Sequence, residues 1–505
     1  MIKLNLNFLK KFSILTLKNQ RITENILYYG DNIERIRETY KKLLTLIPAI
    51  IIISLIIGFK ISKYFLLLDL SVLFIYFYPL LLTEIRKEEH RKTIENEISV
   101  FLLFAYINSL LGKSLYKTFE EITYSSVFKG LSKEAILLIK EVEILGKSSI
   151  SAIENRARIH RSDFLGKVYT SYLNGELIGI SPSERLRRLL DESVDSLKTS
   201  FENYITRVSD IVEIIFLIYL VMPMILLAFQ YISANSNLFV LIIPLLISPI
   251  IYLYILILQP NIGYEINLNN YEKKILFGIP AFLLLLIIHF SLLYLIIGIY
   301  SLFTLLSYTV YRRIKYSDDI LNNLPYALSD ISDYIKLGYS VRNSLGKISS
   351  NNINFRKFLS QISDRIRRGY RISSIKTNMW IVNSILELID SIERKGFADS
   401  FVFKEISLIL DNYITIRKKI MKELNIFNIL SIITPILLFT TFAILSKIKF
   451  IASLDIILVT YSIVLGIIYA KLARFTVFNF PLLASLLAVI IIVVTIPNSL
   501  MSIFI

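Results

Sequence analysis

The sequence predicts an all-α polytopic membrane protein with about nine transmembrane helices and two cytoplasmic helical bundles. Hydrophobic residues make up 54% of the 505 residues and the mean hydropathy is +0.60, values that exclude an ordinary soluble domain. The polar residues are concentrated in two long segments, 84–210 and 311–425, whose apolar positions recur at helical spacing. Because the same design occurs twice, we also predict an internal duplication.

Nine apolar runs are long enough, or nearly long enough, to cross the hydrocarbon core as helices. The fifth and sixth are almost continuous, and only the stretch His289–Ser291 indicates a turn between them. The runs are 43–59, 65–83, 211–230, 238–258, 275–290, 291–310, 426–446, 451–470 and 476–496.

The basic residues predict the orientation. Of the 56 lysines and arginines, only Lys60, Lys63, Lys447 and Lys449 fall on one side of the predicted membrane. Loops rich in lysine and arginine stay in the cytoplasm. We therefore expect a multi-pass protein of the cell membrane with its amino terminus inside and its carboxyl terminus outside.

These spans divide the chain into nine parts. The predicted parts are a cytoplasmic segment 1–42, a first hairpin of two spans 43–83, the first bundle 84–210, two spans 211–258, a short cytoplasmic loop 259–274, two spans 275–310, the second bundle 311–425, three spans 426–496 and an external end 497–505.

One predicted helix connects the first bundle to the membrane. Ser181 and Glu184 form a capping box around Pro182, which predicts a helix start. Apolar residues then recur every three or four positions as far as Asp210, after which the sequence is apolar on every face. The second bundle repeats this design, because the amphipathic segment 401–424 leads directly into an apolar run.

Short matching segments favour a duplication. The matching pairs are Ile-Pro-Ala at 47–49 and 279–281, Leu-Gly at 111–112 and 337–338, and the prolines Pro223 and Pro435. Each of these prolines lies inside a span, where it removes a helical hydrogen bond and predicts a kink. Four spans separate equivalent points, so the two repeats are predicted to have the same orientation.

The composition offers little material for catalysis. Cysteine is absent, which excludes disulfides, thiolate metal sites and thiol nucleophiles. The three histidines, His90, His160 and His289, lie in different segments. We therefore expect no catalytic residue, no metal and no cofactor, and a protein that is not an enzyme.

The tripeptide Gly-Lys-Ser occurs twice, at 112–114 and 146–148. A phosphate-binding loop needs a further glycine five residues before its Gly-Lys pair. Ile107 and Glu141 stand at those positions, so both tripeptides are interpreted as turns at helix ends.

Two basic clusters are candidate binding surfaces. The first, in the middle of the second bundle, consists of Arg365, Arg367, Arg368 and Arg371, and an acidic surface of a partner protein is its expected contact. The second, near the seventh span, consists of Arg417, Lys418, Lys419 and Lys422. Its position predicts a contact with anionic lipid headgroups of the inner leaflet or with a motor protein.

Four stretches resemble one known family. They are LLGKSLYKTFEEI at 110–122, KLGYSVRNSLGKI at 336–348, YLNGELIGISPSERLRRLLD at 172–191 and ERKGFADSFVFKEISLILD at 393–411. Over about residues 43–470 the chain resembles the membrane platform proteins of archaeal type IV pili and the archaellum, which carry the F-type domain of type II secretion systems. In the second copy the lysine of Gly-Lys-Ser becomes a tyrosine, so the second half has diverged.

The resemblance implies a non-enzymatic platform that couples a cytoplasmic hexameric secretion ATPase to the extraction and assembly of pilin or archaellin subunits. It also implies a homo-oligomer, a dimer, with lipids as partners and no nucleic acid. The filament remains open between an archaellum, an adhesive pilus, and a stress-induced or DNA-exchange pilus. A membrane transporter or channel with large cytoplasmic regulatory domains is the alternative, and a membrane-embedded enzyme is a third reading.

Overall fold

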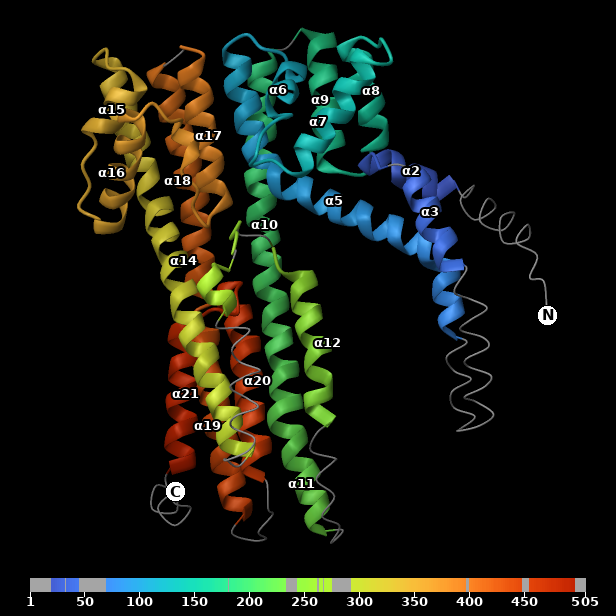
Figure 1. The fold of residues 1–505 in the computed structure, drawn as a ribbon, viewed down its shortest axis with the longest axis vertical. Coiled ribbons are helices and arrows are strands. Elements are labelled where there is room, and N and C mark those ends of the chain that lie inside the picture. The colour runs from blue at the N-terminus through green and yellow to red at the C-terminus, as the bar shows by residue number, and fades with distance from the viewer. Residues whose placement is uncertain are drawn as a thin grey trace, which may run out of the picture. The chain divides into compact units, whose positions relative to one another are not determined.

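A computed structural model describes residues 20–31, 33–44, 70–179, 181–232, 243–260, 263–266, 268–274, 292–396, 399–446 and 454–495. Most of these residues are helical, and the extended structure among them is limited to one isolated bridge between Tyr264 and Met379. The all-α prediction is confirmed. The chain forms two compact units, one ending at Ser193 and the other beginning at Val194 (Figure 1).

The first unit is built around the 41-residue helix α5, which packs against α2, α3, α6, α7 and α9. Aromatic side chains occupy its core, with the Phe119 ring 4.6 Å from Phe101 and 5.6 Å from Tyr169. The helices are α2 (Gln20–Tyr29), α3 (Ile33–Leu44), α5 (Leu70–Leu110), α6 (Leu115–Ile122), α7 (Gly130–Glu143), α8 (Ser149–Ile159), α9 (Phe164–Ile178) and the start of α10 (Pro182–Phe216).

The second unit is organised by the 45-residue helix α14 (Leu292–Lys336), which packs along α18 (Ser400–Glu423) (Figure 1). The other elements are the π-helical turn η2 (Leu217–Val221), α11 (Met222–Ile232), α12 (Ile243–Leu258), α15 (Val341–Lys347), α16 (Ile353–Arg367), the 3₁₀ turn η4 (Ile372–Ser374), α17 (Trp380–Arg394), α19 (Ile426–Ser446), α20 (Leu454–Arg474) and α21 (Phe480–Thr495).

A similar turn follows each of the two long helices α5 and α14. Gly112 and Gly338 have φ angles of 75° and 88°. Residues with a side chain rarely adopt such left-handed values, and a glycine in this conformation commonly ends a helix. Two residues later Ser114 and Ser340 cap α6 and α15, accepting hydrogen bonds from the amides of Lys117 and Asn343. The Leu-Gly match of the sequence thus corresponds to one repeated turn geometry.

Four described helical segments are long and apolar enough to cross a membrane: Pro182–Leu226, Leu292–Lys336, Ser400–Thr441 and Asp455–Arg474. The shorter helices α12 and α21 are also apolar. Of the nine predicted spans, 43–59 and 275–290 lie mostly or wholly outside the described residues, and 65–83 is described only from Leu70.

The helix predicted to leave the first bundle begins at Pro182 and continues into its apolar segment without a break. Just before Pro223 the helix contains the π-turn η2, in which the amide of Met222 bonds to the carbonyl oxygen of Leu217. A proline cannot donate to the residue four positions earlier, and a wider turn accommodates that loss. Pro435, by contrast, lies inside the continuous α-helix α19.

Candidate functional site

The four arginines predicted to bind a partner surround the turn that ends α16. Arg365 and Arg367 lie in the last turn of α16 and Arg368 caps it. Gly369 then adopts a φ angle of 77°, and the amide of Tyr370 bonds back to the carbonyl oxygen of Arg365 at 3.0 Å. This closing turn brings the basic side chains, including Arg371, onto one short stretch of surface.

All four arginines are exposed, and none forms an ion pair with a described residue. Arg365 donates only to Ser374, to its carbonyl oxygen at 3.2 Å and to its hydroxyl at 3.1 Å. Two of the arginines also oppose the negative end of the α16 dipole, a local stabilisation worth about 0.3–1 kcal/mol. The cluster therefore presents a positive surface whose charges are not neutralised by its own bundle.

The second basic cluster is divided by the structure. Lys418, Lys419 and Lys422 are exposed, whereas the Arg417 side chain is 8% exposed and its Nη2 lies 2.7 Å from Oδ1 of Asp318 on α14. The expectation that Arg417 faces headgroups or a motor is corrected, because helical spacing points this residue inward between α18 and α14. Only the three lysines remain available on the surface.

The Arg417 ion pair also holds the loop that follows α12. Tyr264 donates to both carboxylate oxygens of Asp318 at 3.1 Å, and the Arg417 guanidinium lies over the Tyr264 ring. The same loop pairs with the start of α17, where Glu265 N donates to Asn378 O and Trp380 N to Gly263 O, each at 2.8 Å. We call residues 263–266 the strap, because they attach the end of an apolar helix to the second bundle.

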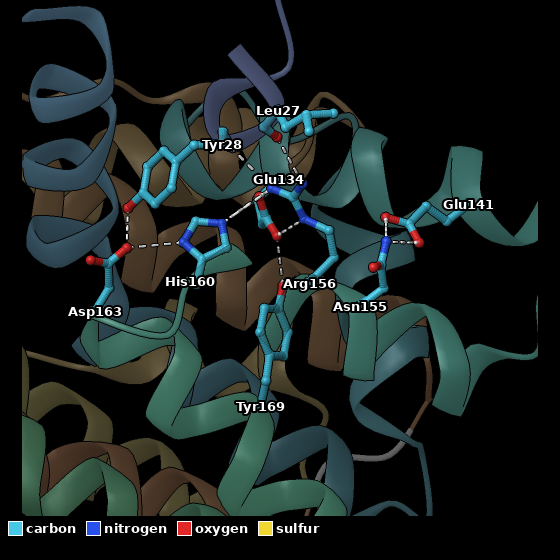
Figure 2. Close-up of polar contacts among 9 residues, drawn as sticks. All are labelled: Leu27, Tyr28, Glu134, Glu141, Asn155, Arg156, His160, Asp163 and Tyr169. Atoms are coloured by element: carbon cyan, nitrogen blue, oxygen red, sulfur yellow. Dashed lines mark hydrogen bonds and ion pairs between the residues drawn. The ribbon is translucent and has the colours of Figure 1, made fainter. Parts of the chain in front are cut away.

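A buried polar network lies in the core of the first unit (Figure 2). Arg156 on α8 donates from Nε to Oε1 of Glu134 on α7 at 2.7 Å, and its Nη2 makes a second bond to the same carboxylate. The Tyr169 hydroxyl donates to Oε1 of Glu134 at 3.1 Å. Arg156 further donates to the carbonyl oxygens of Leu27 and Tyr28 at 3.1 Å, which fixes the end of α2 onto the bundle.

His160 and Asp163 extend this network on its other side (Figure 2). The Nε2 atom of His160 lies 3.2 Å from Oε2 of Glu134, and its Nδ1 lies 3.1 Å from Oδ2 of Asp163. The Tyr28 hydroxyl donates to the same Asp163 oxygen. The Nη2 atom of Arg156 also lies 3.1 Å from Nε2 of His160. Each buried carboxylate is thus paired with Arg156 or His160, as buried charges require.

The network determines how its members ionise. Burial acts to raise the pKa of Glu134, but the charges of Arg156 and His160 outweigh it and lower the pKa. Burial likewise acts to lower the pKa of His160, but Glu134 and the bond to Asp163 outweigh it and raise the pKa. The network therefore favours the ionised form of Glu134 and the protonated form of His160, each more than water does.

His90 on α5 behaves in the opposite way. It is 7% exposed, lies edge-on to the Tyr28 ring at 6.0 Å, and its Nε2 atom has no hydrogen-bond partner. Burial lowers the pKa of His90 to about 4, so this side chain is neutral at pH 7. Two histidines that the sequence places 70 positions apart thus contact the same tyrosine.

The network is closed and its members are almost completely buried, so it lacks an exposed nucleophile. No group of three or more metal-binding side chains is arranged to hold a metal ion within the described residues. The arrangement instead fixes α2, α7, α8 and α9 against one another. The sequence did not reveal this network because Glu134 and Tyr28 are distant in the sequence from its other members. The only local signal was the close spacing of Arg156, His160 and Asp163 around the end of α8.

The two Gly-Lys-Ser tripeptides are confirmed as turns at helix ends. Ser114 and Ser148 cap α6 and α8. Lys113 is paired with Glu121 at 2.5 Å and Lys147 with Glu141 at 2.8 Å. Neither lysine is presented to a phosphate.

Comparison of the chain with protein-family models, with curated proteins and with solved structures finds no match.

Proposed function

We propose that this protein is a non-enzymatic platform for the assembly of an archaeal type IV filament, a pilus or an archaellum. The observation that carries the proposal is the continuity between bundle and apolar helix. The segment Pro182–Leu226 is one helix of 45 residues, and Ser400–Thr441 is one of 42. A displacement of either bundle would therefore be transmitted along a helix to its apolar end.

The proposal includes nine spans and a parallel duplication. The repeated turn after α5 and α14, with Gly112 and Ser114 matching Gly338 and Ser340, supports the duplication. Both bundles would then face the cytoplasm, with the amino terminus inside and the carboxyl terminus outside. Because the chain has no cysteine, a single cysteine at Arg158 or at Lys357, both exposed, can test this orientation by its reaction with a membrane-impermeant reagent.

The proposed cycle begins with a hexameric secretion ATPase that binds the second bundle. The uncompensated charges of Arg365, Arg367, Arg368 and Arg371 support a contact with an acidic surface there. The strap at 263–266 ties this bundle to the end of α12, so movement of the bundle would also reach that apolar helix. Pilin or archaellin subunits would receive the movement within the membrane, from a dimer of the platform.

The test is binding of the full-length protein, in lipid nanodiscs, to the secretion ATPase of its own organism. We expect the wild type to bind, and the variant with the four arginines changed to glutamate to lose at least about tenfold in affinity. The matched control changes Lys404, Lys418, Lys419 and Lys422 to glutamate, which alters the net charge equally, and we expect it to bind with less than about a threefold change.

Three other results are informative. Loss of binding only in the lysine variant would move the motor contact to the end of α18. Equal loss in both variants would indicate general electrostatic attraction. An absence of binding by the wild type, together with flux of a solute into proteoliposomes that contain only this protein, would contradict the platform and favour the transporter or channel.

A further inference from the structure

A cleft of about 700 Å³ opens between α2, α5 and α7 in the first unit. The end of α2, at Tyr29, and the following Gly30 form one wall. Arg86, Glu89 and His90 of α5 and Lys133 of α7 face it. No part of the platform proposal uses this cleft.

Two residues that line the cleft, Tyr29 and His90, each carry a buried polar atom without a hydrogen-bond partner. Nε2 of His90 belongs to a side chain that is 7% exposed and has no partner. The Tyr29 hydroxyl is also buried and meets the geometry of no hydrogen bond, although Arg86 is near enough to influence its pKa. Leaving a buried polar atom unpaired is unfavourable, and a ligand that accepts a hydrogen bond from neutral His90 would remove that penalty.

The charges of the cleft favour an anion. Lys129, Lys133 and Lys140 lie along α7 at intervals of four and seven residues and all line the cleft. Lys133 and Lys140 form no ion pair with any residue in the described part of the chain. Arg86 is compensated by Asp31 at 2.5 Å, which leaves Glu89 as the only other carboxylate in the lining. The cleft therefore has an excess of positive charge.

The backbone amides at the start of α7 are already used. Glu97 of α5 accepts from the amides of Lys129, Gly130 and Leu131 at 2.7–3.1 Å. An anion in the cleft must therefore be bound by side chains, by the lysines and His90, and not by the helix end. Lysine ammonium groups bind phosphate well as point charges.

The position of the cleft on α5 indicates where the anion comes from. The apolar run that is predicted to enter the membrane ends at Thr83, and α5 continues from it without interruption. At 1.5 Å per residue, Arg86 and His90 lie within about 10 Å of that end. The polar layer of a bilayer extends about 5–8 Å beyond the hydrocarbon core. With the span 65–83 in the membrane, a topology that this inference shares with the proposed function, the near side of the cleft would lie at the level of the lipid headgroups.

We propose that the cleft between α2, α5 and α7 binds a phosphate group, and that an anionic phospholipid headgroup of the inner leaflet supplies it. The Lys133 and Lys140 ammonium groups neutralise the phosphate, and His90 donates one hydrogen bond from Nε2. A soluble phosphate compound has the same chemistry, and the experiment separates these two sources.

The experiment uses full-length protein, labelled with ¹⁵N-histidine, in a non-ionic detergent. The chain has only three histidines, so the His90 signals can be assigned with a His90→Gln variant. A short-chain phosphatidylglycerol and inorganic phosphate are titrated separately, and the His90 shifts give each affinity. We expect the lipid to shift the His90 resonances at concentrations at least about tenfold below those that inorganic phosphate needs.

Lys133→Glu with Lys140→Glu should weaken lipid binding by at least about tenfold, because two charge-assisted contacts are lost. The matched control, Lys92→Glu with Lys198→Glu, has the same change in charge at exposed residues outside the cleft and should change the affinity by less than about twofold. Unchanged His160 resonances in the unliganded variant show that the bundle has folded.

Equal weakening in the cleft variant and the control would overturn the proposal, because the attraction would then depend only on net charge. An unshifted His90 resonance with both ligands would overturn it as well. Equal affinity for inorganic phosphate and lipid would keep the phosphate site and reject the membrane as its source.

Discussion

Arg156 and Glu134 form a doubly hydrogen-bonded ion pair in the core of the first unit, with side chains that are 3% and 0% exposed. Buried pairs of this kind are costly to break, because removing one partner leaves an uncompensated charge without water. The pair also binds the end of α2 through Leu27 and Tyr28, so its loss should affect more than one helix.

The first prediction concerns this pair. Glu134→Leu and Arg156→Met should each destabilise the first unit by about 3–5 kcal/mol, whereas the double variant should cost less than either single variant. Hydrogen exchange of α2, α7 and α8 measures the effect locally. Additive losses in the double variant would show that the two side chains do not depend on one another.

The second prediction concerns the histidines. In ¹⁵N spectra, the pKa of His160 should lie above the ordinary histidine value, because Glu134 and Asp163 raise it, while His90 should stay neutral down to about pH 4. A His289→Asn variant simplifies the assignment. Titration of both residues near the ordinary histidine pKa would contradict the buried network.

The third prediction gives the consequence for stability. The pKa of His90 is about 4 in the folded protein and 6.5 in the unfolded chain. Its contribution to stability is therefore complete above pH 6.5 and is lost as the pH falls from 6.5 through about 4. For His90 the loss is roughly 3 kcal/mol, from 1.36 kcal/mol per pKa unit. His160, with a raised pKa, loses its contribution instead as the pH rises through the folded value.

Thermal unfolding at a series of pH values measures both effects. His90→Gln should reduce the loss of stability on the acidic side and leave the alkaline side as in the wild type. A variant that loses stability toward acid as steeply as the wild type would show that His90 is not responsible.

The fourth prediction concerns the repeated turn. Gly112→Ala and Gly338→Ala should each destabilise their bundle by about 1–2 kcal/mol, because an alanine at a φ of 75° or 88° is strained even in open space. Gly346→Ala is the control, since Gly346 lies inside α15 with equally open surroundings, and it should stabilise by up to about 1 kcal/mol. Equal effects at all three positions would contradict the turn geometry.

The fifth prediction concerns the strap. Trp380 is the only tryptophan in the chain and its amide is bonded to Gly263, so its fluorescence reports on residues 263–266. Asp318→Asn should loosen the strap and increase acrylamide quenching of Trp380, because Arg417 loses its counter-charge. Asp333→Asn, which removes an exposed pair with Lys336, should leave the quenching unchanged.

The sequence alone determined the helical class, because its apolar positions follow helical periodicity over nearly the whole chain. It also determined the helix start at Pro182 and the turn after residue 111, since capping residues and glycines act within a few positions. The long apolar helices follow from composition in the same way. Local signals of this kind need no knowledge of which segments meet.

The tertiary structure alone decided what Arg417, His90 and His160 do. In the sequence Arg417 belongs to a run of basic residues, but the packing of α18 on α14 turns it inward toward Asp318. The histidines lie in separate segments, yet α5 and the end of α8 bring both to Tyr28. Burial and the partner charges that set their pKa values come from helices distant in the sequence, and only the folded chain brings those helices together.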